Sequence, residues 1–222
     1  MITNKDYLLS IRKCYLFDNI KDEQLADAIK LLNGRIKKIE KDDFIVQLGG
    51  ELPSAGLLLK GRIESSFQNE NFDQITMHSF CGGYLFGEAL VINNAKNSPV
   101  QVRAVEDCIV LFIDLSVIYH SDIQSPIRVI LSENLIKSLA RKNLILNQKV
   151  RILSRKSLRE RILFYLGTLP KDKNGYVKIP FNKTVLAEYL GVNRSALSRE
   201  LGRMQDEGIL IADGRKMKTL IR

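Results

Sequence analysis

Short runs of apolar residues recur between about residues 17 and 115. They read FIVQ, GLLLK, RIESSF, QITMHSF, QVRAV and CIVLFI, and stretches rich in Gly, Asn or Pro separate them. This spacing is typical of a small antiparallel β sandwich or barrel. The segment DEQLADAIKLLN, which precedes the first run, has a helical period instead. Its apolar face consists of Leu25, Ala28, Ile29 and Leu32.

One long helical pattern starts after Ser125 and Pro126 and continues without Gly or Pro until Gly167. Two rows repeat every seven residues along it, one formed by Leu139, Leu146 and Leu153 and the other by Ile136, Asn143 and Val150. Neighbouring seams of this kind suit a coiled-coil contact between two copies of the chain. The alternative is that the stripe covers the chain's own β domain, although the helix is too long for one small core to cover.

The C-terminal part predicts a helix-turn-helix followed by a short hairpin. The expected elements are a helix from Lys183 to Leu190, a turn from Gly191 to Asn193 and a helix from Arg194 to about Glu207. Two tightly crossing helices need a small residue in the first helix and a residue that tolerates positive φ in the turn, and Ala187 and Gly191 meet these needs. Asn193 is expected to cap the second helix. Asp213-Gly214 predicts the turn of the hairpin, which would form a wing.

The helical period divides this segment into two faces. The apolar seam consists of Leu186, Leu190, Val192, Leu197, Leu201 and Met204. The side chains expected to point outward are Arg194, Ser195, Ser198, Arg199 and Arg203. An outward row with three arginines favours a surface that meets nucleic acid.

The positive charge of the chain lies in its last third. Residues 1–150 hold 18 Lys and Arg against 18 Asp and Glu, whereas residues 151–222 hold 16 against 7, which accounts for the whole net charge of +9. A basic module joined to a neutral one is typical of a nucleic-acid-binding protein. The alternative is an ordinary solvated basic surface.

Composition narrows the remaining classes. The 222 residues, 45% of them hydrophobic, suffice for two modest domains with buried cores. The longest apolar run, Cys108 to Ile113, is far shorter than the roughly 20 residues of a membrane span, so a cytoplasmic protein without membrane contact is expected. Three scattered cysteines offer no metal pair or disulfide framework. The chain shows no paired nucleophile and base, no Walker A loop and no metal-ligand spacing, so no enzyme is expected.

Four segments match the pattern of one protein family. GVNRSALSRELGRMQDEGILI resembles the recognition helix and wing strand of the Crp/Fnr regulators, and VRILSRKSLRERILFYL resembles their junction between dimer helix and DNA-binding domain. KGRIESSF and YLFGEALVINNAKNSPVQVRAVEDCIVLFID resemble the family's β-roll and phosphate-binding cassette. The resemblance implies an α+β chain in three parts. These are an antiparallel β-roll of the double-stranded β-helix or jelly-roll type that senses an effector (1–125), a dimerisation helix (126–156) and a winged helix-turn-helix (157–222).

The resemblance also implies a homodimer on double-stranded DNA, with one second helix in each of two successive major grooves of a roughly palindromic operator, and a contact with RNA polymerase. In the family, the arginine that corresponds to Arg199 reads a guanine edge. Ser198 matches a serine of the Fnr-like branch, and Arg194 matches an arginine of the Crp-like branch, so both are expected to read bases as well. Ser195 stands where the family often has glutamate. The resemblance therefore leaves open which base pair Ser195 would read. Phosphate contacts fall to Asn182, Lys183, Arg203, Arg215, Lys216 and Lys218.

Relatives that bind cyclic AMP hold the ribose with a glycine-glutamate pair and the phosphate with an arginine and a small hydroxyl residue. Gly87-Glu88 matches the first pair, but Asn97-Ser98-Pro99 stands at the second, and no arginine occurs between Arg62 and Arg103. The positions that would meet adenine are Leu146 and Asn147. Cyclic AMP is therefore not expected, although these seven residues remain the candidate effector pocket. Gly87-Glu88 can equally be a tight turn.

The sequence gives little support for sensing through a metal cofactor or a thiol. Three cysteines in one chain cannot supply the four thiolates of an iron-sulfur cluster, so none is expected. Haem bound through His78 or His120 and a thiol switch at Cys14 stay open. A different class of function is a ligand-binding module that acts on a protein partner, and salt-dependent DNA binding would separate it from a regulator.

Overall fold

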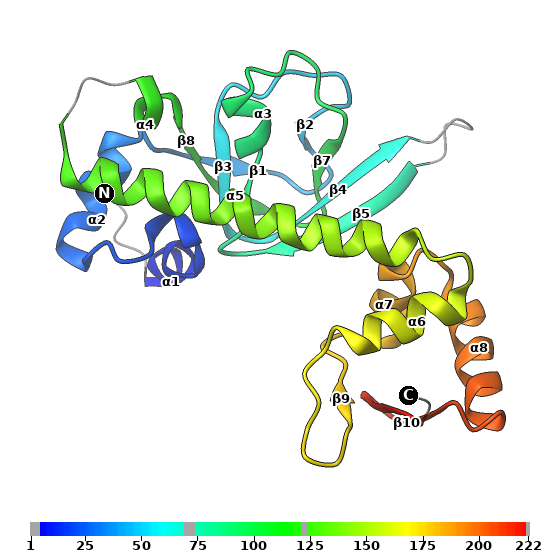
Figure 1. Ribbon diagram of the computed structural model, residues 1–222. Helices are drawn as coiled ribbons and strands as arrows, with labels where there is room; N and C mark the ends of the chain where they lie inside the picture. The colour runs from blue at the N-terminus through cyan, green and yellow to red at the C-terminus, as the bar shows by residue number, and fades with distance from the viewer. Residues whose placement is uncertain (1–4, 69–73, 121–123, 221–222) are drawn as a thin grey trace. The chain divides into compact units, whose positions relative to one another are not determined.

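The computed structural model describes residues 5–68, 74–120 and 124–220, which form two compact units, 1–140 and 141–222 (Figure 1). One helix, α5 (Pro126–Leu153), begins in the first unit and ends in the second. No helix among the described residues is both long enough and apolar enough to cross a membrane.

Two four-stranded antiparallel sheets build the first unit. One has the order β1 (Arg35–Ile39), β8 (Cys108–Ile113), β3 (Ala55–Lys60) and β6 (Leu85–Phe86). The other has the order β2 (Phe44–Val46), β7 (Gln101–Ala104), β4 (Arg62–Gln68) and β5 (Gln74–Cys81). The six apolar runs all form strands, whereas β1 and β6 were not expected. Strands from distant parts of the sequence therefore lie side by side, as β1 and β8 do through the pairing of Ile36 with Leu111.

Helices flank the sheets of this unit. They are α1 (Lys5–Lys13), the 3-10 turn η1 (Tyr15–Phe17), α2 (Asp22–Leu31), α3 (Glu88–Ile92) and α4 (Ser116–His120). The expected face of α2 is confirmed, because Leu25, Ala28, Ile29 and Leu32 are buried. These side chains share one core cluster with β3, β8 and the first half of α5.

The first half of α5 is tied to the N-terminal segment by one buried side chain. Asn134 is 4% exposed, and its amide nitrogen donates to the carbonyl oxygens of Leu16 and Asp18 at 3.1 and 2.6 Å. Leu131 and Leu135 on the same part of the helix are buried in the core cluster of α2. The first half of α5 therefore shares its core with α2.

The long helical pattern is interrupted, although no Gly or Pro marks the break. α5 ends at Leu153, and α6 (Leu158–Gly167) starts only after Ser157. The Ser157 hydroxyl accepts from the amide of Glu160 at 3.2 Å, and the Glu160 carboxylate accepts from the amide of Lys156 at 3.1 Å. The helical period up to Gly167 is therefore shared by two helices, because these caps satisfy the groups that a new helix start leaves unpaired.

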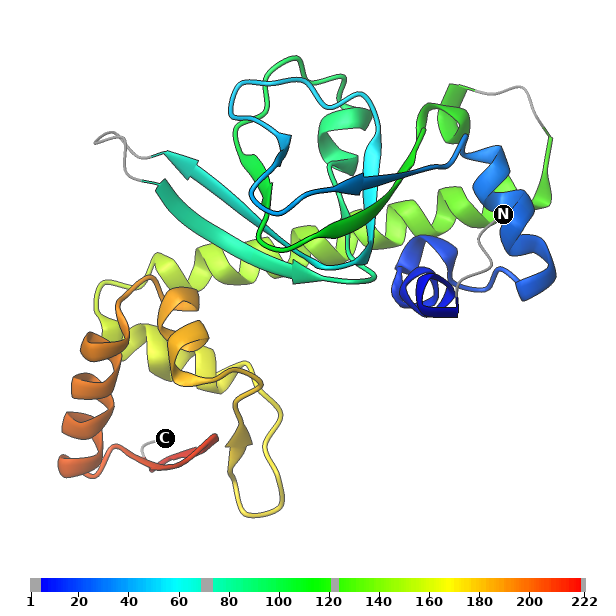
Figure 2. The same ribbon diagram turned by 180° about the vertical axis from the view of Figure 1, so that it is seen from behind.

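The second unit holds the remaining helices and a small sheet (Figure 2). They are α6, α7 (Lys183–Tyr189) and α8 (Arg194–Asp206), with β9 (Val177–Lys178), β10 (Leu210–Asp213) and β11 (Lys216–Thr219) in the order β10-β11-β9. The predicted hairpin is present, but its turn lies one residue later than expected. Asp213 pairs with Lys216, so Gly214 and Arg215 form the turn, and Gly214 supplies the positive φ of 59°.

Candidate nucleic-acid interface

The crossing of α7 and α8 is held by the apolar seam that the helical period predicts. Five of its side chains are buried to 3% exposure or less, and Val192 packs against them: Leu186, Leu190, Leu197, Leu201 and Met204. Ala187 is 1% exposed at the crossing, and Gly191 has a φ of +71° in the turn. Both small residues therefore occupy the positions where a larger side chain would clash or strain the backbone.

The opposite face of α8 is open to solvent. Its exposed side chains include the four that the sequence assigned to base edges, Arg194, Ser195, Ser198 and Arg199. Gly202 lies on the same face, and a Cβ added there would meet no atom within 4 Å. A helix surface with two guanidinium groups, two hydroxyls and an open backbone position suits approach by a polar, anionic partner.

Two asparagines cap the helices of this motif. The Asn193 side-chain oxygen accepts from the amide of Ala196 at 2.8 Å, which confirms the predicted cap of α8. Asn182, assigned by the sequence to phosphate, caps α7 by accepting from the amide of Val185 at 2.9 Å. The side-chain oxygen of Asn182 therefore already accepts a hydrogen bond, whereas its side-chain NH2 group remains able to donate to a ligand. The signal for this cap was present in the sequence, since asparagine before a helix is a common N-cap.

The basic residues assigned to phosphate have different surroundings. Lys183 in the first turn of α7 is exposed, as are Arg215 and Lys216 in the wing. Arg203 is exposed and its guanidinium lies 4.0 Å from the Glu200 carboxylate. Lys218 is half-buried, with its ammonium 5.5 Å from the centre of the Tyr176 ring. Lys218 therefore lies against the segment before β9, at Gly175 and Tyr176, whereas the other four reach solvent.

An ion-pair network behind α8 was missed by the sequence reasoning. Arg159 of α6 donates to Glu200 at 2.7 Å and to both carboxylate oxygens of Glu207 at 2.6 and 2.9 Å. These hydrogen bonds raise the pKa of Arg159, and the guanidinium lowers the pKa of Glu207. Nothing local in the sequence signals partners that lie 41 and 48 residues away. The network fixes α8 against α6 from the side opposite its exposed face.

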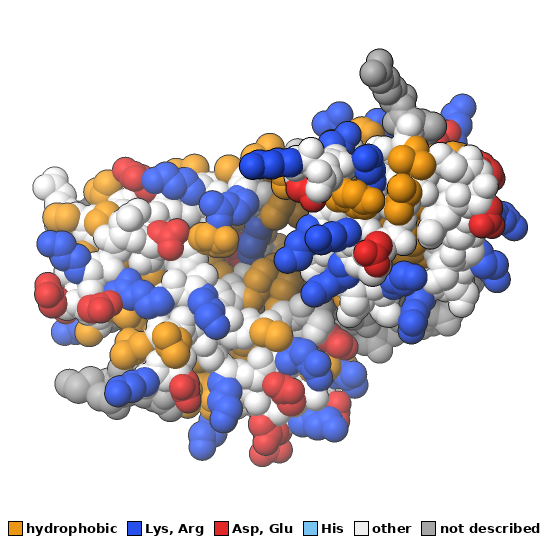
Figure 3. All heavy atoms as spheres, turned by 90° about the horizontal axis from the view of Figure 1, so that it is seen from below, with side chains coloured by type: hydrophobic (Ala, Val, Ile, Leu, Met, Phe, Trp, Pro, Cys, Tyr) orange, Lys and Arg blue, Asp and Glu red, His pale blue; other side chains and the backbone are white. Residues whose placement is uncertain are grey.

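The surface charge follows the sequence count. The space-filling view shows many Lys and Arg side chains on the visible surface, with Asp and Glu between them (Figure 3), and residues 151–222 hold 16 Lys and Arg against 7 Asp and Glu. A hollow of about 520 Å³ also borders α8 and is lined by Leu158, Ala196, Arg199, Glu200 and Arg203. The exposed face of α8 thus belongs to a predominantly basic unit.

Comparison with protein families assigns both units. A model described as "Crp-like helix-turn-helix domain" matches residues 160–222, and one described as "Cyclic nucleotide-binding domain" matches residues 36–120. The two matches together cover most of the chain, in the order sensor and then DNA-binding module. The chain belongs to the Crp/Fnr family. It is a DNA-binding transcription regulator of that family, whose members are typically dimers and not enzymes.

Relatives from several bacteria agree with this assignment. The electron transport regulator A of Shewanella oneidensis is 25% identical over 202 residues, which are 87% of this chain and 76% of that protein. A CooA variant from Carboxydothermus hydrogenoformans has a similar fold, with a TM-score of 0.57 and 20% identity over 90% of this chain and 92% of its own. The catabolite activator protein of Thermus thermophilus also has a similar fold, with a TM-score of 0.55 and 20% identity. The match covers 92% of this chain and 93% of that protein's chain. The sequence-based identification as a Crp/Fnr regulator with an α+β fold is therefore confirmed.

The family's phosphate-binding cassette is closely packed in this Crp/Fnr protein. Gly87 has a φ of +77°, and a Cβ added to it would lie 2.2 Å from Leu52, whose side chain is 6% exposed. Glu88 and Ser98 are buried, and the Ser98 hydroxyl donates to the carbonyl oxygen of Val100 at 2.5 Å. A side chain larger than that of glycine would therefore clash with Leu52 at position 87, and the Ser98 hydroxyl is bonded within the protein.

Charge at the cassette is balanced as well. Lys96 is the one basic residue between Gly87 and Val100, and its ammonium lies 2.8 Å from the Glu51 carboxylate. Asn97 and Pro99, on either side of Ser98, are exposed. An anionic ligand here would meet no uncommitted cation within the segment 87–100.

The remaining residues of the candidate effector pocket are on α5. Leu146 and Asn147 belong to the part of α5 that lies in the second unit, whereas Gly87 belongs to the first. Leu146 is 61% exposed, and the Asn147 amide donates to the Asn143 side chain at 2.6 Å.

Other sensing chemistries were assigned to cysteines and histidines. Cys14 is buried at 2% exposure, Cys81 is exposed, and burial raises the pKa of the Cys108 thiol. The side chains of His78 and His120 lie outside the described residues. Within the described part of the chain, no three His, Cys, Asp or Glu side chains gather as they would around a metal ion.

Proposed function

We propose that this regulator reads a roughly palindromic operator as a homodimer, with α8 of each copy in a major groove. The observation that carries the proposal is the exposed face of α8, where Arg194, Ser195, Ser198 and Arg199 surround the open backbone at Gly202. A major groove of B-DNA admits one α-helix, and such side chains donate to base edges there. The family resemblance further supports a contact with RNA polymerase.

Within this face, Arg199 reads a guanine through two hydrogen bonds to O6 and N7. Ser198 and Ser195 meet neighbouring base pairs, and Arg194 reaches the edge of the groove. Lys183, Arg215 and Lys216 hold phosphates, helped by the amide of Asn182 and by Arg203. Lys218 also binds a phosphate, which requires its ammonium group to move away from the Tyr176 ring. This division separates the residues that specify sequence from those that position the protein.

Matched substitutions test the division. Arg199→Ala removes a bidentate contact, which costs about 1–3 kcal/mol per half-site and relaxes selectivity at one base pair. Lys183→Ala or Lys216→Ala weakens binding to all sequences alike and reduces the salt slope by about one unit per contact. Gel shifts on specific and scrambled DNA at several salt concentrations measure both effects.

Equal weakening of both DNAs by Arg199→Ala would contradict its role in reading bases. Absence of salt-dependent binding to any DNA would contradict the proposed function as a whole, and would favour a module that acts on a protein partner.

The apolar stripe on α5 supports the homodimer. Ile136, Leu146 and Val150 are exposed by 67%, 61% and 56%, and Asn143 and Leu153 are also exposed. Leu139 differs, since it packs in part against the first unit's own core. Large exposed apolar side chains at seven-residue spacing are characteristic of a helix that packs against a second helix.

Sedimentation of charged variants tests the dimer. Ile136→Glu combined with Val150→Glu places carboxylates of both copies in one seam, so monomers are expected. Ile145→Glu is the matched control, because Ile145 is 54% exposed but lies off the two rows. A double variant that still sediments as a dimer would place the contact elsewhere.

The effector of this regulator is a compound other than cyclic AMP. The Ser98 hydroxyl donates to the carbonyl oxygen of Val100, and Lys96, the one basic residue of segment 87–100, is paired with Glu51. A cyclic phosphate placed there would lose hydration without gaining a charged partner. Calorimetry that detects micromolar binding of cyclic AMP would overturn this conclusion.

A further inference from the structure

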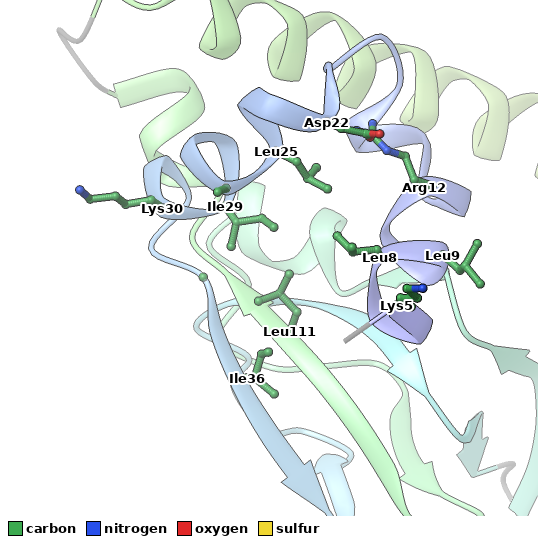
Figure 4. Close-up of a pocket in the computed structure, with 12 residues that line it drawn as sticks. Lys5, Leu8, Leu9, Arg12, Asp22, Leu25, Ile29, Lys30, Ile36 and Leu111 are labelled. Atoms are coloured by element: carbon green, nitrogen blue, oxygen red, sulfur yellow. The ribbon is translucent and has the colours of Figure 1, made fainter. Parts of the chain in front are cut away.

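An open cavity of about 1070 Å³ lies in the first unit, between α1, α2 and the edge strand β1 (Figure 4). Figure 4 shows the side chains of Leu8, Leu25, Ile29, Ile36 and Leu111 directed toward one space from these elements and from β8. The volume lies slightly above the usual range for small-molecule sites, about 300–1,000 Å³. The cavity lies apart from the cyclic-nucleotide cassette, since none of its lining residues belongs to segment 87–100.

The walls of this cavity are aliphatic. Among the described residues that line it, none carries an aromatic ring, a hydroxyl or a side-chain amide. Leu8 and Ile36 remain 37% and 45% exposed, so their apolar surface is in contact with water. Covering such a surface is favourable only for an apolar group, and a flexible aliphatic chain can follow walls made of leucine and isoleucine.

Charged side chains stand at the edge of the cavity. The Arg12 guanidinium forms an ion pair with the Asp22 carboxylate, so these two charges are engaged with each other. Arg12 also donates to the carbonyl oxygen of Ile20 at 2.6 Å. Lys5 and Lys30 also belong to the lining, and neither ammonium group bonds to a described residue. The lining therefore carries a net charge of +2, from three cations and one carboxylate.

We propose that this cavity binds an aliphatic carboxylate of the fatty-acid class. The acyl chain lies among Leu8, Leu25, Ile29, Ile36 and Leu111, where it needs no hydrogen-bond partner. The carboxylate remains at the edge, where it is attracted by the net positive charge of the lining, to which Lys5 and Lys30 contribute from different helices. A neutral ligand would not use these two charges, and a highly polar one would find no partner along the walls.

The position of the cavity also provides a route to α5. Leu25, Ile29 and Leu111 belong to the same buried cluster as Leu131 and Leu135 of α5. Closely packed side chains transmit small displacements, so an acyl chain that shifts α2 shifts the first half of α5 as well. This regulatory consequence rests on the proposed function, whereas binding of the carboxylate does not.

Calorimetry on the full-length protein tests the binding. Decanoate, kept below its micelle concentration, is the probe, and decanol is its neutral counterpart. We expect saturable binding of decanoate that weakens about tenfold in Ile36→Glu, because a carboxylate then stands in the apolar wall. Phe44→Glu is the matched control, since Phe44 is 44% exposed on β2, an edge strand of the other sheet, and should change binding by less than about twofold.

A second pair of variants examines the charged edge. Lys5→Ala combined with Lys30→Ala should weaken decanoate but not decanol, and high salt should have the same effect. Both lysines are exposed, so these variants are expected to fold, which circular dichroism verifies.

The outcomes separate the possibilities. No binding of decanoate, or equal weakening by Ile36→Glu and Phe44→Glu, would overturn the proposal. A higher oligomer that Ile36→Glu dissociates would also overturn it, because a second copy would then occupy the cavity. If the protein binds decanoate at this cavity but no DNA, the proposed function fails and the present inference stands.

Discussion

The N-cap of α8 offers a way to separate the stability of the recognition helix from its contact with DNA. Asn193 accepts one hydrogen bond from Ala196 at 2.8 Å and contributes no buried apolar surface. Replacing it with alanine leaves that amide without its cap, which costs about 1 kcal/mol, within a range of about 0.5–2. One kcal/mol corresponds to about a fivefold change in an equilibrium constant, so α8 should open about five times more often.

Hydrogen exchange measured by mass spectrometry reports that opening in the full chain. Peptides from α8 in Asn193→Ala should exchange about fivefold faster, while peptides from β3 and β8 in the first unit stay unchanged. Asn193→Asp is the informative companion, because an aspartate keeps the cap and its negative charge favours the helix N-terminus. Exchange in α8 should therefore stay the same or become slower.

The order of these variants in DNA affinity should differ from their order in the stability of α8. Asn193→Asp places a negative charge at the end of α8 that approaches the phosphates, so it should weaken binding although the helix is stable. Asn193→Ala should weaken binding less and with little change in salt slope. If both variants accelerate exchange in α8 equally, the cap is not what holds the start of the helix. If Asn193→Asp leaves DNA affinity unchanged, this end of α8 does not face the duplex.

Three further predictions concern other parts of the molecule. Arg159→Gln removes the bonds that hold α8 to α6, so hydrogen exchange in α8 should rise and selectivity for the specific DNA should fall, even though Arg159 lies off the exposed face. Leu131→Ala leaves a cavity at a fully buried position of α5 and should lower the free energy of unfolding of the first unit by about 2–5 kcal/mol in urea titrations. The hydroxyl of Ser116 lowers the pKa of Asp114, so this contribution to stability is present above the carboxylate's unfolded pKa and is lost as pH falls through its lower native value. Ser116→Ala should therefore raise the pKa of Asp114 in an NMR titration and shift the onset of acid unfolding to higher pH.

Local patterns predicted much of the fold and of the interface. The period of apolar residues located α2, α7, α8 and six strands, and it placed Arg199 on the exposed face of α8. The helices among them have one buried and one exposed side that alternate with the helical period, whereas the strands were marked by short apolar runs, and β3 is buried at five residues in a row. The glycine turn and the Asn193 cap were predictable for a similar reason, since their geometry depends on a few neighbouring residues.

The pattern failed where burial does not alternate. Four of the five residues of β1 are exposed and three are basic, so no apolar period marks it as a strand. It is a strand because β8, about 70 residues later, offers a row of backbone groups for pairing. The break between α5 and α6 leaves no trace in the apolar period either, because the Ser157 and Glu160 caps that mark it are polar residues within a continuous helical period.

The sequence by itself determined the family, the order of the sensor and DNA-binding parts, and which face of α8 is exposed. The tertiary structure alone decided that a side chain at position 87 would clash with Leu52, that Arg159 joins Glu200 to Glu207, and that α1, α2 and β1 enclose a cavity. In each of these cases the partners are far apart in the chain. Periodicity records which side of its own element a residue faces, whereas the identity of the opposing side chain depends on how the elements pack.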